Sequence, residues 1–109
     1  MTEPNFKMTR KEHLMIRAME ECAELSQRFS KALVFGLDQI QEDANDKPEE
    51  NPLGLTNRER IVNEFNDLVA VMAMCGFHYV KIVDANKFAA KMDKVERYLE
   101  RSRRCGTLV

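Results

Sequence analysis

Five acidic residues stand out because their spacing would bring several carboxylates onto one face of a helix. Glu20, Glu21 and Glu24 lie within five positions of an otherwise apolar segment, and Glu64 and Asp67 lie three residues apart in a second apolar segment. Like charges three or four residues apart destabilise an isolated helix by about 0.2–0.5 kcal/mol. This crowding therefore requires a compensating interaction in the folded protein.

A helical wheel shows that the acids of both segments border apolar surfaces. Glu24 lies in a narrow polar stripe, and about two thirds of the circumference of its helix is apolar. In the second segment, no charged residue follows Asp67 from Leu68 to Phe77. Both segments should therefore be covered on more than one side, with their acids facing a shared interior.

Carboxylates in such an interior need a cation or several hydrogen-bond donors. Four of the acids form two pairs, each spaced by three residues, and they outnumber the basic residues nearby. A hard divalent cation such as Mg²⁺ or Mn²⁺ answers this excess of carboxylates better than lysine does. A di-iron centre would require Glu-x-x-His pairs, and neither His13 nor His78 follows these glutamates at that spacing. For Glu20, Glu21 and Glu24 taken alone, the alternative is an ordinary solvated charged face. For Glu64 and Asp67 taken alone, the alternative is a pair of acids near the start of a helix, where the helix dipole favours negative charge.

The first acidic segment is predicted to be a helix of about 25 residues. Thr9 and Glu12 have the spacing of a capping box, in which each side chain bonds a free amide of the first turn. Gly36 is suited to the closing position at the other end. Residues 37–55, rich in Asp, Glu, Asn and Pro, predict an irregular acidic connection, with a lid over a site as the alternative.

Two further helices are predicted after this connection. Thr56 and Glu59 repeat the capping-box spacing, so the second helix should run over about 57–80 with Gly76 inside it. Asp84 is placed to cap the third helix. The apolar residues of the third helix fall at spacings of four, three and four: Phe88, Met92, Val95 and Leu99.

The totals favour one all-α domain, 1–109, with three main helices. At 109 residues, folding buries only about 60–65% of the surface of the unfolded chain. Because the first two helices are apolar over most of their circumference, we expect a homo-oligomer, either a dimer or a tetramer, to complete the bundle.

The composition also argues against nucleic acid and membranes as partners. With 17 basic and 18 acidic side chains, the chain has no excess of positive charge to favour nucleic acid. No segment has the roughly 20 apolar residues of a membrane span, and the N-terminus lacks the apolar run of a signal peptide. Three widely spaced cysteines, Cys22, Cys75 and Cys105, are typical of reduced thiols. These features predict a cytoplasmic protein.

The two acidic pairs resemble a known paired motif. Glu21-x-x-Glu24 and Glu64-x-x-Asp67, within EECAELSQRFSKALVFG and LTNRERIVNEFNDLVAVMAM, resemble the metal-binding motif of the MazG-like all-α nucleoside triphosphate pyrophosphohydrolases. NKFAAKMDKVE is similar to a run in a later helix of that family, although Ala85 and Ala90 depart from it. The resemblance covers about residues 9–100 and is to the short single-domain bacterial and phage members.

The resemblance implies an enzyme that cleaves a nucleoside triphosphate, NTP or dNTP, to the monophosphate and pyrophosphate, with a mild preference for dGTP or GTP. It implies that Glu21, Glu24, Glu64 and Asp67 bind Mg²⁺, with Mn²⁺ as a substitute. Glu20 is the candidate for orienting or deprotonating the attacking water, with a purely structural role as its alternative.

The substrate side of the site is expected to use residues on the first and third helices. Lys31, Lys87 and Lys91 are candidates for the phosphates, and Asn86 for the sugar or base; a solvated surface role is the alternative for each lysine. Two other functions are compatible with the pattern. One is a non-catalytic helical interaction module, and the other is a MazG-shaped regulator that binds nucleotides without cleaving them.

Overall fold

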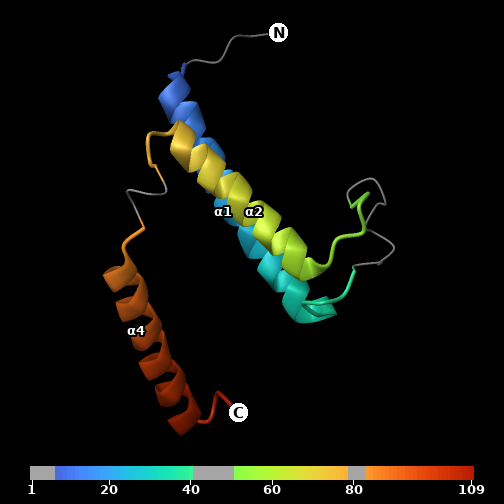
Figure 1. The fold of residues 1–109 in the computed structure, drawn as a ribbon, viewed down its shortest axis with the longest axis vertical. Helices are drawn as coiled ribbons and strands as arrows, with labels where there is room; N and C mark the ends of the chain where they lie inside the picture. The colour runs from blue at the N-terminus through green and yellow to red at the C-terminus, as the bar shows by residue number, and fades with distance from the viewer. Residues whose placement is uncertain (1–6, 41–50, 79–82) are drawn as a thin grey trace. The chain divides into compact units, whose positions relative to one another are not determined.

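The computed structural model describes residues 7–40, 51–78 and 83–109, and within these ranges the chain is all-helical (Figure 1). Helix α1 spans Arg10–Phe35, α2 spans Asn57–Met74 and α4 spans Ala85–Arg104. The described ranges contain no strand, only an isolated antiparallel bridge between Ile40 and Thr56. The chain divides into two units, Met1–Phe77 and His78–Val109. The predicted fold class is confirmed.

Helix α1 begins and ends where the sequence predicts. The Glu12 amide donates to Thr9 Oγ1 at 3.1 Å, and the Thr9 amide donates to Glu12 Oε1 at 3.0 Å, so the capping box is complete. Gly36 follows the last helical residue with φ +101°, a conformation that residues with a Cβ rarely adopt. The helix has 26 residues, about 39 Å at 1.5 Å per residue.

Helix α2 starts at the predicted residue but ends earlier than expected. Thr56 and Glu59 form the second capping box. At the other end, the Phe77 amide donates to the Met72 carbonyl at 2.9 Å and the Gly76 amide to the Ala73 carbonyl at 3.0 Å. These two bonds form a Schellman motif, with Gly76 at φ +97°.

The second helix was expected to contain Gly76 and to run to about Val80. The part of this expectation that concerns Gly76 is wrong, because Gly76 closes the helix. Glycine closes the helix because it takes the left-handed conformation without strain and lets the chain satisfy the last carbonyls. Val80 itself lies outside the described residues. Of the predicted irregular connection, residues 37–40 and 51–55 are described and contain no helix; a lid formed by residues 41–50 falls outside the described ranges.

The end of α1 and the start of α2 are joined by a set of hydrogen bonds that we call the clasp. The Asn57 side chain is 1% exposed, and its Nδ2 donates to the Gly36 carbonyl at 2.9 Å. The Asn57 and Arg58 amides donate to the carbonyls of Gln39 at 2.9 Å and Leu37 at 2.8 Å. The clasp turns the chain back on itself, so α1 and α2 lie side by side and antiparallel (Figure 1).

The pairing of α1 and α2 buries little apolar surface. Of the apolar side chains in the described ranges, only that of Ala32 is buried, at 5% exposure. Met19, Leu33 and Val34 on α1 are 71%, 89% and 70% exposed. Both helices thus keep the apolar surface that their sequences place on more than one side.

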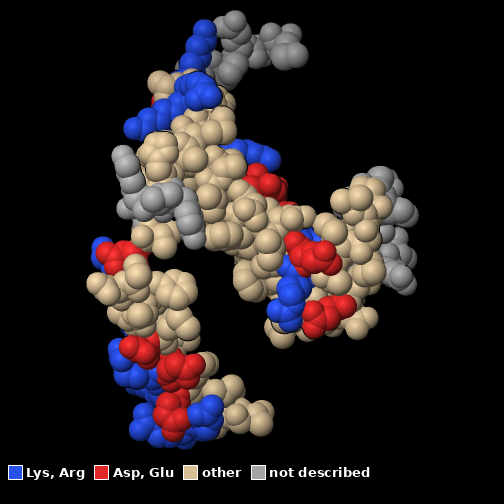
Figure 2. Space-filling view, in the orientation of Figure 1, with Lys and Arg blue, Asp and Glu red and all other residues tan. Residues whose placement is uncertain are grey.

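Helix α4 forms the second unit and has the predicted cap. Asp84 Oδ1 accepts from the Lys87 amide at 3.0 Å. The stripe of Phe88, Met92, Val95 and Leu99 is exposed within its own unit. Figure 2 shows charged side chains gathered on the C-terminal half of α4, whose last turn is basic. No helix among the described residues is long and apolar enough to cross a membrane.

Replacing Asn57 with Ala should lower the free energy of unfolding by about 1–3 kcal/mol, since a buried donor is lost from the clasp. The Gly36 carbonyl would keep only a longer 3.4 Å bond from the Gln39 amide. Urea unfolding followed by circular dichroism measures the change. Asn66→Ala is the matched control, because the Asn66 side chain is exposed and donates to the Val62 carbonyl of its own helix. Its expected effect is within about 0.5 kcal/mol; equal losses in both variants would contradict the clasp.

Candidate metal centre

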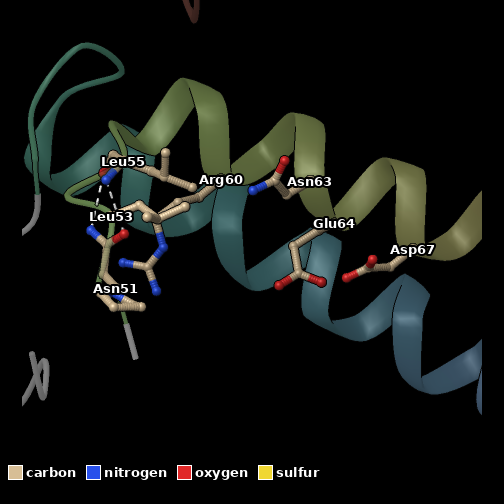
Figure 3. A pocket seen from close by; sticks show the side chains of 8 residues that line it. Asn51, Leu53, Leu55, Arg60, Asn63, Glu64 and Asp67 are labelled. Atoms are coloured by element: carbon tan, nitrogen blue, oxygen red, sulfur yellow. Dashed lines mark hydrogen bonds between the residues drawn. The ribbon is translucent and has the colours of Figure 1, made fainter. Parts of the chain in front are cut away.

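Three of the four predicted ligands meet between the two antiparallel helices. Glu21 comes from α1, and Glu64 and Asp67 come from one side of α2. One carboxylate oxygen from each of the three residues lies within 4.8 Å of the others. Figure 3 shows the Glu64 and Asp67 carboxylates side by side, facing away from the α2 axis. We call these three residues, together with Glu24, the acidic cluster.

Glu24, the fourth predicted ligand, lies at the same place. It is partly buried, and its carboxyl group is close enough to raise the pKa of both Glu21 and Glu64. It is one helical turn from Glu21, so the spacing of three residues does put both carboxylates on the same side of α1. The structure therefore brings all four predicted ligands to one place.

Two oxygens of the acidic cluster are buried without a partner. Glu21 is 4% exposed, and its Oε2 has no hydrogen-bond donor among the described residues. The Oε2 of Glu64 is also buried without a hydrogen-bond donor among the described residues. A buried carboxylate oxygen with no donor costs free energy that a bound cation would recover. The unpartnered Oε2 of Glu21 is the observation that distinguishes this cluster from an ordinary acidic surface.

The pKa values of two cluster residues reflect this environment. Burial raises the pKa of Glu21, and the neighbouring Glu24 carboxyl raises it further, while Arg17 acts in the opposite direction. Burial also raises the pKa of Glu64, followed by the charges of Glu24 and Asp67. Without a cation, Glu21 and Glu64 hold protons more tightly than free glutamate does, and a bound cation would displace these protons.

Glu20 lies outside the acidic cluster. Its Oε2 accepts a hydrogen bond from Arg17 Nη1 at 2.7 Å, and its side chain is 54% exposed. The same guanidinium reaches Glu21 Oε1 through Nη2 at 3.0 Å. This pairing favours the structural alternative for Glu20, while its role as a catalytic base remains a prediction.

A pocket of about 250 Å³ adjoins the cluster on the side of Glu64 and Asp67 (Figure 3). One wall is the turn from Asn51 to Leu55, where the Asn51 side chain donates to the Leu55 carbonyl and accepts from its amide. The other wall is α2, which contributes Arg60 and Asn63. The pocket thus has a cationic side chain and two carboxylates along one helix.

Sequence reasoning missed Arg60 and Asn63, although a signal for them was present. Arg60 precedes Glu64 by four residues and Asn63 precedes Asp67 by four, so each lies within about 40° of a cluster residue on the helical wheel. The predicted substrate-binding residues are placed differently. Lys31 is on α1, two turns beyond Glu24, and is not one of the described residues that line the pocket.

The other substrate-binding candidates, Asn86, Lys87 and Lys91, belong to the first two turns of α4. All three are exposed and lie in the second unit of the chain, so the described geometry of the acidic cluster does not include them. Their part in a site remains a prediction.

The donor set suits a hard divalent cation. All the oxygens come from carboxylates, which Mg²⁺ and Mn²⁺ prefer, and the group of three contains neither histidine nor cysteine. His13 and His78 are exposed. The three cysteines are free thiols, as the sequence predicts.

Comparison of the chain with models of protein families, with curated proteins and with solved structures found no match.

Ionisation of Glu64 should destabilise the metal-free protein. A carboxyl group whose pKa is raised by folding binds more protons in the folded chain, so stability falls as pH rises from the ordinary Glu value of 4.5 through the raised value. Glu64→Gln removes this contribution. In urea unfolding with a chelator present, the stability of Glu64→Gln relative to the unsubstituted protein should increase with pH over this range. A difference that is constant or that decreases would contradict the assignment.

Proposed function

We propose that this protein is a metal-dependent nucleoside triphosphate pyrophosphohydrolase of the MazG-like type. It would convert an NTP or dNTP to the monophosphate and pyrophosphate, acting on the cytoplasmic nucleotide pool. The observation that carries the proposal is the acidic cluster, with Glu21 almost fully buried and one of its oxygens unpartnered. The resemblance of the two acidic pairs to the family motif supplies the reaction.

Glu21, Glu24, Glu64 and Asp67 would hold Mg²⁺, or Mn²⁺ in its place. When bound, the cation would neutralise charge on the phosphates as negative charge builds up during the reaction. The reaction itself is attack of a water oxygen on the α-phosphorus, with cleavage of the bond to the oxygen that bridges the β-phosphate. The protein side chains hold the reacting groups in line, and Glu20 remains the candidate for receiving the proton of the water.

The pocket beside the cluster suggests where part of the nucleotide binds. Arg60 lines it within one helical turn of Glu64, so a phosphate group held at the cluster would lie near a guanidinium, which binds phosphate oxygens well. Pro52, Leu53 and Leu55 offer an apolar wall suited to a sugar or base. Lys31, Asn86, Lys87 and Lys91 remain candidates for contacts beyond this pocket.

A panel of nucleotides with Mg²⁺ or Mn²⁺, including dGTP and GTP, tests the reaction. We expect a nucleoside monophosphate and pyrophosphate as products, resolved by ion-exchange chromatography. Glu64→Gln and Asp67→Asn should each reduce kcat/KM by more than about 100-fold, because direct ligands cost more than the 10–100-fold typical of their supporting residues. Release of a diphosphate and inorganic phosphate would contradict α–β cleavage, and activity retained in both variants would exclude the metal assignment.

A second candidate function is a non-catalytic helical module that binds another protein or a nucleotide. The observation that favours it is an apolar groove of about 270 Å³ between α1 and α2, formed mainly by Met15, Met19, Leu68, Met72 and Phe77. In such a module, replacing cluster residues would leave partner binding intact. The nucleotide panel separates the two functions, since only the enzyme turns over its ligand.

We further propose that the apolar faces of α1 and α2 pack against another copy of the chain. Among the described residues of the unit that contains α1 and α2, one apolar side chain, that of Ala32, is buried, which is a very small core for two helices of this length. In Figure 2, the middle of the visible face of these two helices carries no charged side chain, and the charged side chains lie at its ends and along one edge. Stable homodimers are built on apolar surfaces of this kind.

The mass in solution checks this association. Light scattering coupled to size-exclusion chromatography at micromolar concentration should give twice or four times the 12.7 kDa of one chain. Leu33→Lys, at a residue 89% exposed on α1, should shift the mass towards that of one chain because it places a charge in the apolar interface. Lys11→Glu, at an exposed position in the first turn of α1, is the control. A stable monomer of the unsubstituted protein would contradict the proposal.

A further inference from the structure

Arg17 makes an unusual contact for an exposed basic residue, because it forms an ion pair with one oxygen of a buried carboxylate. Its Nη2 lies 3.0 Å from Glu21 Oε1, and its Nη1 lies 2.7 Å from Glu20 Oε2. The Arg17 side chain is 53% exposed, whereas that of Glu21 is 5% exposed. The guanidinium therefore sits at the rim of the acidic cluster, with one buried and one exposed partner.

The two oxygens of Glu21 have different environments as a result. Oε1 is held by Arg17, while Oε2 is buried without a donor. The guanidinium is a rigid fork, so bonding Glu20 through one nitrogen fixes the direction of the other towards Glu21. Glu20 thus anchors Arg17, and Arg17 in turn restricts the rotation of the Glu21 carboxylate.

We propose that Arg17 is a positioning residue for a divalent cation at the acidic cluster: it holds Glu21 Oε1 so that Oε2 is presented to the cation. Carboxylate ligands of metals are commonly oriented by a hydrogen bond to their other oxygen, and loss of that contact typically costs 10–100-fold in metal affinity. At Glu21, the ion pair with Arg17 takes this place. The inference rests on the cation site proposed above, but not on nucleotide hydrolysis.

A competing role for Arg17 predicts the opposite sign. If the guanidinium merely neutralised the cluster in place of a metal, its removal would relieve repulsion and competition, and the cation would bind more tightly. The exposure of Arg17 argues against that role, because a cation standing in for the metal would be enclosed by the carboxylates. The change in cation affinity when Arg17 is replaced therefore separates the two roles: weaker binding indicates positioning, and tighter binding indicates competition.

The test is Mn²⁺ binding to the metal-free protein without nucleotide, measured by electron paramagnetic resonance and isothermal titration calorimetry. Arg17→Gln should weaken binding by about 10–100-fold. Arg17→Lys keeps the charge but bonds only one carboxylate at a time, so its affinity should fall between those of Arg17→Gln and the unsubstituted protein. If circular dichroism shows that Arg17→Gln does not fold, Arg17→Lys provides the test.

Arg58→Gln is the matched control. Arg58 is similarly exposed, at 58%, and its side chain pairs with Asp38 at 2.9 Å, away from the acidic cluster. The Arg58→Gln variant should bind Mn²⁺ as tightly as the unsubstituted protein does. Unchanged or tighter binding in both Arg17 variants would overturn the positioning role while leaving the cation site in place. Absence of Mn²⁺ binding to the unsubstituted protein would overturn both.

Discussion

The structure depends on one constraint, the burial of a carboxylate between two helices that share almost no apolar core. Glu21 is placed against Glu64 and Asp67 by the antiparallel pairing of α1 and α2, which the clasp around Asn57 holds in register. Ordinarily, acids that meet in this way push helices apart. Here the hydrogen bonds of the clasp and the Arg17 contact oppose that repulsion, and a cation would convert it into an attraction.

The elements were largely predictable because their ends are set by local chemistry. Two capping boxes and Asp84 mark the starts of the three helices, and each needs only residues three positions apart. The end of α2 was not predictable in the same way. Glycine inside a helix and glycine closing a helix look alike in a sequence, and only the bonds of Gly76 and Phe77 to the preceding turn distinguish them.

The candidate site was predictable to a similar extent. Each acid pair is spaced by three residues, which predicts that its two carboxylates lie on the same side of their helix. Periodicity also places Arg60 on the side of α2 that carries Glu64, but it does not show the pocket, because the other wall is the turn at Asn51–Leu55. Arg17 was visible on the polar stripe of α1, but the division of its two bonds between an exposed and a buried carboxylate is a matter of side-chain geometry.

The clasp also separates the pairing of the helices from the length of the segment that connects them. Asn57 and Arg58 bond directly to Gly36, Leu37 and Gln39, and the bridge from Ile40 to Thr56 closes the same end. Once a loop is closed at its base, doubling its length costs only about 0.6 kcal/mol. The register of α1 and α2 therefore depends little on how many residues connect them.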